Sequence, residues 1–225
     1  MSEKTFSCAD CGVQACKSAQ ADKYPQFCPT KNIDPKLVEG SLARYAANEE
    51  AKNLVGVSSV LEAEFYCKLC RVEETIEFIK RMGYKKIGLA TCVGLLRETK
   101  IFAKILRDNN IDYFAACCKT GAVDKETLGL TPEQKINGGC GHESMCNPLL
   151  QADVLAREGT DFNVVIGLCV GHDSLFLKNS QAPVTVMIVK DRVMGHNPVA
   201  ALYAAEGIYS RFTDVSKSWK TPAKE

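Results

Sequence analysis

Twelve cysteines carry most of the chemistry that this sequence offers, because thiolates bind soft metal ions and act as nucleophiles and redox groups. A disulfide scaffold is the alternative use of so many cysteines, but such scaffolds are typically short, secreted and poor in core residues. This chain has 225 residues, 46% of them hydrophobic, and its N-terminus lacks the apolar core of a signal peptide. We therefore expect a cytoplasmic protein whose thiols serve metal or redox chemistry.

The first group of cysteines lies in a polar segment with several turn residues and comprises Cys8, Cys11, Cys16 and Cys28. Four thiolates from one glycine-containing loop can surround a tetrahedral Zn²⁺ or the four irons of a cubane cluster. The Cys-x₂-Cys start and the Cys28-Pro29 finish are typical of ferredoxin ligation, whereas the middle spacings are not. Residues 1–33 are therefore predicted to form a metal-binding module. A 4Fe-4S cluster is favoured, and zinc is the alternative.

A second group is defined by position. Cys92, Cys118 and Cys169 each follow a short apolar run, and Cys146 closes a long glycine-bearing loop, residues 119–147. Parallel strands place their carboxyl ends on one edge of a sheet, where ligands of α/β proteins bind. These four cysteines are predicted to share a second metal site. The alternative is a set of packed or surface thiols that hold no metal.

Only one residue of the pair Cys117 and Cys118 can face such a site if the strand continues through both, because successive side chains point to opposite faces. We assign Cys118 to the site and Cys117 to packing. The roles of Cys67, Cys70 and Cys140 stay open.

Charged and small residues beside the second group are the candidate catalytic and cofactor-binding residues. His172, Asp173 and Lys119 are placed to donate or accept protons or hydrogen bonds. A lone histidine is more often structural, so that alternative also stays open. Gly94 and Gly171, each two residues after a cysteine and close to a predicted helix start, are the candidate cofactor-binding glycines.

The pattern of elements predicts an α/β fold. Helices are expected from Asp34 to about residue 66, with Val72, Ile76 and Ile79 on one face up to Gly83, and further on at 94–106 and 147–157. Buried strands are expected at 87–92, 112–116, 162–168 and 184–189. The result is a Rossmann-like parallel sheet with helices on both faces, within a domain of residues 34–225.

Charge and hydropathy exclude other classes of partner. The formal net charge of +1 gives no reason to expect nucleic acid. No segment approaches the roughly 18 apolar residues of a membrane span. A small-molecule substrate or a redox partner protein is the expected partner, and the oligomeric state is undetermined.

The sequence resembles the DUF1847 family, a domain of unknown function. The resemblance rests on six runs in this chain: 88–95, 118–121, 146–148, 167–173, 189–193 and 196–198. It extends over nearly the whole chain and implies a cysteine-rich metal-binding protein of anaerobic bacteria and archaea. It implies the eight cysteines of the two groups as family-type cysteines and implies no reaction.

The function predicted is that of an iron–sulfur protein with one or two clusters, in which the second site, if it keeps one open iron, binds a small substrate as a Lewis acid. Such a protein would be a reductase or a sulfur-handling enzyme. A non-enzymatic electron carrier or metal-trafficking protein is the first alternative. A zinc-bound thiol redox sensor is the second.

Overall fold

The structure is a computed structural model that describes residues 7–214 of the chain. It divides into two compact units between Glu62 and Ala63. Each unit is described by itself.

The N-terminal unit consists of short turns followed by helices. After three 3₁₀ turns come α1 (Pro29–Asn32), α2 (Pro35–Ala47) and α3 (Glu49–Phe65). Asp34 caps α2 through a hydrogen bond from the Lys36 amide, as its Asp-Pro start predicts. One helical run to residue 66 was expected, but Asn48 interrupts it. Its backbone is extended, and its side chain accepts from the Ala51 amide over 3.0 Å, which starts a new helix.

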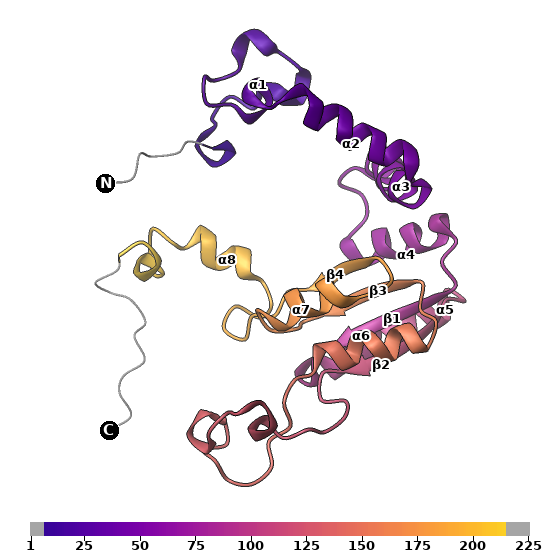
Figure 1. Ribbon diagram of the computed structural model, residues 1–225, viewed down its shortest axis with the longest axis vertical. Coiled ribbons are helices and arrows are strands. Elements are labelled where there is room, and N and C mark those ends of the chain that lie inside the picture. Colours follow the sequence, from indigo (N-terminus) through magenta and orange to yellow (C-terminus); the bar gives the residue numbers. More distant parts are fainter. Residues whose placement is uncertain (1–6, 215–225) are drawn as a thin grey trace. The chain divides into compact units, whose positions relative to one another are not determined.

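The second unit is an α/β fold built on four parallel strands in the order β2-β1-β3-β4 (Figure 1). This confirms the predicted fold class. The elements run α4 (Arg71–Met82), β1 (Lys86–Thr91), α5 (Leu96–Asp108), β2 (Asp112–Cys117), α6 (Pro148–Arg157), β3 (Phe162–Ile166), α7 (His172–Asn179), β4 (Val184–Ile188) and α8 (Pro198–Tyr203).

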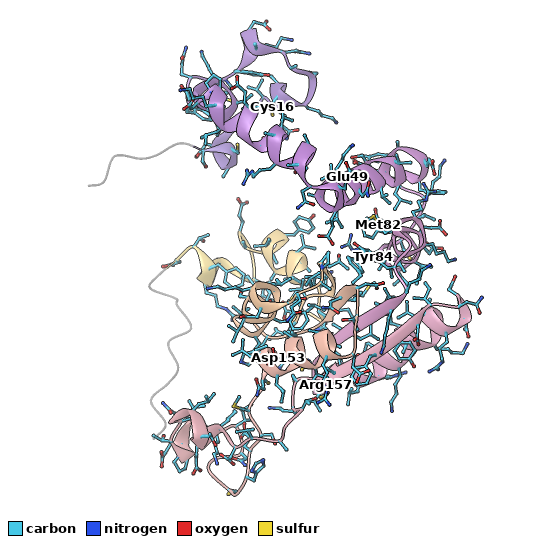
Figure 2. The ribbon with its side chains drawn as sticks, turned by 45° about the vertical axis from the view of Figure 1, so that its right-hand side comes forward. Cys16, Glu49, Met82, Tyr84, Asp153 and Arg157 are labelled. Atoms are coloured by element: carbon cyan, nitrogen blue, oxygen red, sulfur yellow. The ribbon has the colours of Figure 1, made fainter. Side chains whose placement is uncertain are left out.

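Helices cover both faces of the sheet. Strand order and right-handed crossovers send α5 to one face, and α6 with α7 to the other. The α6 helix turns Ala152 and Leu155 toward the sheet and leaves Asp153 and Arg157 exposed (Figure 2). The central strands β1 and β3 are almost wholly buried, whereas the edge strands are half-buried. Continuous apolar runs are the expected pattern for strands covered on two sides.

Gln151 on α6 ties the ends of two strands together. Its fully buried Nε2 donates to the Thr91 carbonyl over 3.1 Å and to the Ala116 carbonyl over 2.8 Å. Thr91 is the last residue of β1, and Ala116 is the last but one of β2. The contact therefore fixes the two strand ends from which the cysteine-bearing turns begin.

Among the described residues, no helix is both long and apolar enough to cross a membrane.

Replacing Gln151 with Leu keeps the side-chain volume but leaves two buried carbonyl groups without this donor. We expect the free energy of unfolding to fall by about 1–3 kcal/mol, from roughly 0.5–1.5 kcal/mol for each hydrogen bond lost, because the Thr91 carbonyl still accepts from the Cys118 amide. Urea denaturation measures it. Asp153→Asn, on the exposed face of the same helix, is the control and should change stability by about 0.5 kcal/mol or less. A Gln151→Leu protein as stable as the control would contradict this role.

Candidate thiol centre at the carboxyl edge of the sheet

Strand order brings three of the predicted cysteines to neighbouring positions. β1 pairs with β2 on one side and with β3 on the other. Cys92 directly follows β1, Cys118 directly follows β2, and Cys169 lies three residues after the end of β3. The chain leaves β1 and β3 toward opposite faces, so the carboxyl ends of these two strands form the switch point at which α/β proteins of this strand order bind ligands.

Cys146 reaches the same edge through a backbone contact. The amide of Asn147 donates to the carbonyl of Cys118 over 2.8 Å, immediately before Pro148 starts α6. A tight turn positions Cys169. Gly167 adopts a φ of +68°, and a Cβ there would lie 2.7 Å from Leu95 Cδ1. Only glycine fits this close approach of the two turns without a rearrangement.

The Cys118 thiol lies at the centre of the group. Its side chain is in hydrogen-bond contact with the thiols of both Cys92 and Cys146. Cys118 is 1% exposed and Cys92 is 6% exposed, whereas Cys146 and Cys169 are half-buried. Cys117 points away and packs against the hydrophobic core. The structure thus places Cys118, and not its neighbour, with the other strand-end thiols.

Nitrogen donors from the chain contact all four sulfurs. The Val93 amide lies 3.4 Å from Cys118 Sγ, and the Gly94 amide hydrogen-bonds to Cys92. Lys190 Nζ donates to Cys92 Sγ over 3.1 Å.

Two more cations complete the set. The side chain of Lys119 hydrogen-bonds to Cys146, and an Arg192 guanidinium nitrogen lies 3.2 Å from Cys169 Sγ. Amide and cationic donors of this kind stabilise negative charge on sulfur.

These contacts separate the pKa values of the three inner thiols. The Cys118 thiol, together with the Gly94 amide and Lys190, lowers the pKa of Cys92 to about 4. The pKa of Cys146 falls to about 5, through Cys118 first and then Lys119 and His172. The pKa of Cys118 itself is raised, because its proton is held between two thiolates and it is buried. Cys118 has one S–H and donates to one neighbour at a time, so the cations must stabilise the other thiolate.

Replacing Cys118 with Ala should move the pKa values of both neighbouring thiols toward the ordinary cysteine value of about 8.5, because their shared donor is gone. Ultraviolet absorbance of the thiolate, followed against pH in metal-free protein, measures this. Cys117→Ala is the matched control and should leave the titration unchanged. Identical curves for both variants would rule out the central position of Cys118.

The other predicted residues have different outcomes. Lys119 contacts Cys146 and also donates to the Ser144 carbonyl over 2.5 Å. His172, the first residue of α7, acts on Cys146 through its charge. The Asp173 carboxylate instead accepts from the Ser174 amide within the first turn of α7.

The two predicted glycines also differ. A Cβ on Gly94 would lie 3.2 Å from Lys190 Nζ and 3.9 Å from Cys92 Sγ, so this glycine makes room for the lysine beside the sulfur. Gly171 caps α7 with a φ of +87° and has open space around it. Whether either glycine contacts a cofactor stays a prediction.

Sequence reasoning missed Lys190 and Arg192 as parts of this edge. Both follow β4, the fourth strand to end here. A brace within the same turn holds them: the Asp191 carboxylate accepts from the Val193 and Met194 amides, and the Asp191 amide donates to His196 Nδ1. Two basic residues soon after the predicted strand 184–189 were the available signal, because that position belongs to the same edge as the cysteines.

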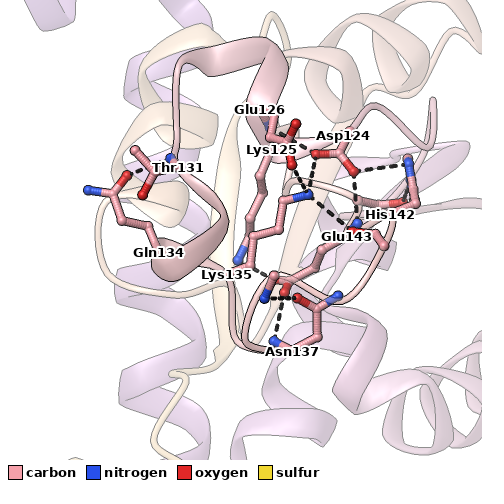
Figure 3. A network of polar contacts seen from close by, with 12 residues as sticks. Asp124, Lys125, Glu126, Thr131, Gln134, Lys135, Asn137, His142 and Glu143 are labelled. Atoms are coloured by element: carbon pink, nitrogen blue, oxygen red, sulfur yellow. Dashed lines mark hydrogen bonds and ion pairs between the residues drawn. The ribbon is translucent and has the colours of Figure 1, made fainter. Parts of the chain in front are cut away.

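The long loop 119–147 is ordered by its own charges (Figure 3). Lys135, whose side chain is 2% exposed, lies 2.9 Å from an Asp124 oxygen and 2.6 Å from a Glu126 oxygen. Asp124 also accepts from the Glu126 and Glu143 amides and pairs with His142 at 3.1 Å. The backbone hydrogen bonds of Lys125 to Glu143 and of Met145 to Val123 close the stem. The stem holds Cys146 near Lys119.

The ionisation of Asp124 should make the stability of this loop depend on pH. Hydrogen bonds from Glu126, Lys135 and Glu143 hold the pKa of its carboxyl well below the usual value near 3.9. A lowered pKa stabilises the folded loop at higher pH, and this stabilisation is lost as the pH falls through the folded value. Hydrogen exchange of the Glu126 and Glu143 amides should be about tenfold faster in Asp124→Asn at neutral pH, because these amides lose a charged acceptor. Asp153→Asn is the control. Unchanged exchange would contradict the role.

The N-terminal cysteines belong to the other unit. Cys8 and Cys16 are exposed, Cys11 is half-buried, and Cys28 is buried at the N-terminus of α1 (Figure 2 labels Cys16). Burial alone would raise the pKa of Cys28, but hydrogen bonds from the Lys31 and Thr30 amides lower it. An amide-lined thiolate fits metal ligation or nucleophilic chemistry.

Two unassigned cysteines lie just before α4. Cys67 and Cys70 are both exposed. Cys70 precedes the first residue of α4 and, with α5 and β4, lines a mostly apolar groove of about 400 Å³. The groove does not include the strand-end thiols, so Cys70 is not part of the centre.

All twelve cysteines lie within residues 7–214 and are free thiols. Across this part of the chain, no group of three or more His, Cys, Asp or Glu side chains has the arrangement of a metal-ion site. Thiolates on one tetrahedral metal ion lie about 3.8 Å apart, given metal–sulfur bonds of about 2.3 Å. The contacts of Cys118 with two sulfurs approach such a set, while Cys169 would have to turn inward from Arg192. The ligand roles of all eight predicted cysteines stay predictions.

A doubly wound parallel sheet with a cluster of thiols at its switch point defines an α/β protein with a candidate thiol centre. The chain matches the family described as "Protein of unknown function (DUF1847)" over residues 28–187, and it belongs to that family. It is also 43% identical to an uncharacterised protein of Methanocaldococcus jannaschii over 198 residues, which is 88% of this chain and 94% of the relative. The predicted family is confirmed.

Proposed function

We propose that the strand-end cysteines form a thiolate-ligated metal centre, with Cys92, Cys118 and Cys146 as the inner ligands and Cys169 as the fourth. The observation that carries the proposal is the contact of the Cys118 thiol with both other inner thiols, at the ligand-binding edge of the sheet. Three sulfurs of one sheet edge, each with a nitrogen donor, suit a metal that takes soft ligands.

Iron–sulfur chemistry remains the favoured form, because four cysteines in a reducing cytoplasm are the usual ligands of such a cluster. When bound, the cluster would supply electrons or an open iron that polarises a small substrate. The chain's own residues would hold it. Val93 and Gly94 donate amide hydrogen bonds to the ligand sulfurs, and Lys119 and Lys190 balance their charge. Donors of this kind tune the reduction potential of a cluster.

This centre would make the protein a small-molecule reductase or a sulfur-handling enzyme. The N-terminal cysteines, Cys8, Cys11, Cys16 and Cys28, would form a separate metal module, with zinc as its alternative metal. If both centres prove fully coordinated, the protein is an electron carrier or a metal-trafficking protein.

Anaerobic purification followed by iron, sulfide and zinc analysis and electron paramagnetic resonance tests the metal centre. Cys118→Ser should lose the metal of the sheet edge, because it removes the ligand that touches two others. Cys117→Ser is the matched control and should keep all of it. Cys8→Ser with Cys11→Ser should lose only the N-terminal metal. Equal metal per chain in all of these proteins would refute both assignments.

A thiol redox switch is the second candidate, and the same central position of Cys118 favours it. Two thiols in contact can join as a disulfide, releasing two electrons and two protons to an oxidant such as glutathione disulfide. In this case Cys118 would pair with Cys92 or Cys146, and zinc would stay in the N-terminal module. Peptide mapping after treatment with glutathione disulfide would find the pair, and Cys117 would stay reduced.

A further inference from the structure

Three cations from two separate loops converge on the thiol centre. Lys119 follows Cys118, whereas Lys190 and Arg192 follow β4. Lys190 contacts Cys92 at 3.1 Å, and Arg192 contacts Cys169 at 3.2 Å. The Arg192 charge also acts on Cys92 and Cys146, although its direct contact is with Cys169.

The thiol centre has a buried part and an exposed part. Cys118 and Cys92 form the buried floor, while Val93, Gly94 and Arg192 are exposed at the rim. At Gly94 a Cβ would stand 3.2 Å from Lys190 Nζ and 3.9 Å from Cys92 Sγ. The missing side chain lets the Lys190 ammonium lie close to the turn after β1 while it contacts Cys92. A small molecule that approaches from the exposed rim meets Arg192 before it reaches the buried thiols.

We infer that this edge binds a small anionic molecule with a carboxylate or phosphate group, which Arg192 and Lys190 hold while its other end faces the sulfurs of Cys92 and Cys146. The inference rests on the proposed function of this edge as a reaction centre and names the class of its substrate. Arg192 is the stronger specificity residue, because within residues 7–214 one of its nitrogens contacts Cys169 and its planar fork matches two oxygens of an oxyanion.

The braced turn supports this role. Arg192 and Lys190 are held by the Asp191 carboxylate, which accepts two amides of its own loop, and by the Asp191 amide, which donates to His196. The cations are therefore presented by a preorganised turn. Preorganisation lowers the entropy cost of binding a ligand.

The test compares two alkylating reagents of nearly equal size, the anion iodoacetate and the neutral iodoacetamide, on the metal-free full-length chain. Each forms an S–C bond with a thiolate and releases iodide. The ratio of the two rates at one cysteine does not depend on how much thiolate is present or on how reactive that thiolate is. It reports the electrostatic potential at that sulfur. Peptide mass spectrometry gives the ratio at Cys146 and Cys169, with the exposed Cys67 of the same unit as internal reference.

At Cys146 and Cys169 the ratio of iodoacetate to iodoacetamide should exceed that at Cys67 by about tenfold at low salt, and high salt should reduce the difference. Arg192→Gln and Lys190→Gln should each lower it about threefold to tenfold. Lys178→Gln, which removes an exposed cation from the far end of α7, is the control and should leave it unchanged. A ratio that equals the Cys67 value, or that falls equally in Lys178→Gln, overturns the inference.

A second measurement needs no variant. Inorganic phosphate and acetate are added separately, each against chloride at equal ionic strength, and iodoacetamide alkylation of Cys146 is followed. Slower alkylation with phosphate identifies a phosphate site, slower alkylation with acetate identifies a carboxylate site, and no protection by either overturns the inference. The alkylation rates are measured on metal-free protein, so they test the anion site alone. The metal analysis under the proposed function tests the metal centre separately.

Discussion

β1 lies between β2 and β3, and the connections that leave β1 and β3 pass to opposite faces of the sheet. This topology places a switch point at the carboxyl edge, between the ends of β1 and β3, where α/β proteins bind ligands. Three turns, those after β1, β2 and β3, begin at this edge, and each carries a cysteine. With other residues there, the same strands would give an ordinary α/β domain, so the site is a property of the turns.

Holding several thiols together in a largely buried place is unfavourable unless their protons and charges are arranged. Three kinds of contact stabilise the thiols here. The Cys118 thiol contacts both inner neighbours, two backbone amides of the turn after β1 donate to Cys118 and Cys92, and cations from outside that turn contact the sulfurs. Lys119 and Arg192 act from two other loops. The electrostatics of the centre therefore depend on segments far apart in the sequence, while its sulfurs depend on the sheet. A substitution of Lys190, in the turn after β4, would therefore change the electrostatic environment of Cys92 without replacing a cysteine.

Most of the fold was open to prediction, because its signals are local. Buried parallel strands read as short apolar runs, and the Asp34-Pro35 and Asn147-Pro148 pairs marked helix starts correctly. The break at Asn48 was missed, since an Asn within a helical composition does not reveal whether its side chain will cap the next helix. The edge position of Cys92 and Cys169 followed from strand ends. The contacts of Lys190 and Arg192 did not, because strand order and the path of a loop after β4 are long-range features.

The loop between β2 and α6 has a stem, closed by the backbone pairs of Val123 with Met145 and of Lys125 with Glu143, and a tip beyond it. Lys135 ties the tip to the stem through Asp124, and its contacts to Glu126 and the Gly141 carbonyl lie within the tip. The register of Cys146 is set instead by the stem and by the contact of Asn147 with Cys118. Length and sequence in the tip are thus decoupled from the spacing of the sulfurs. Within a family that shares the sheet edge, this is the segment free to diverge, and it is where partner preference can change while the thiol chemistry stays the same.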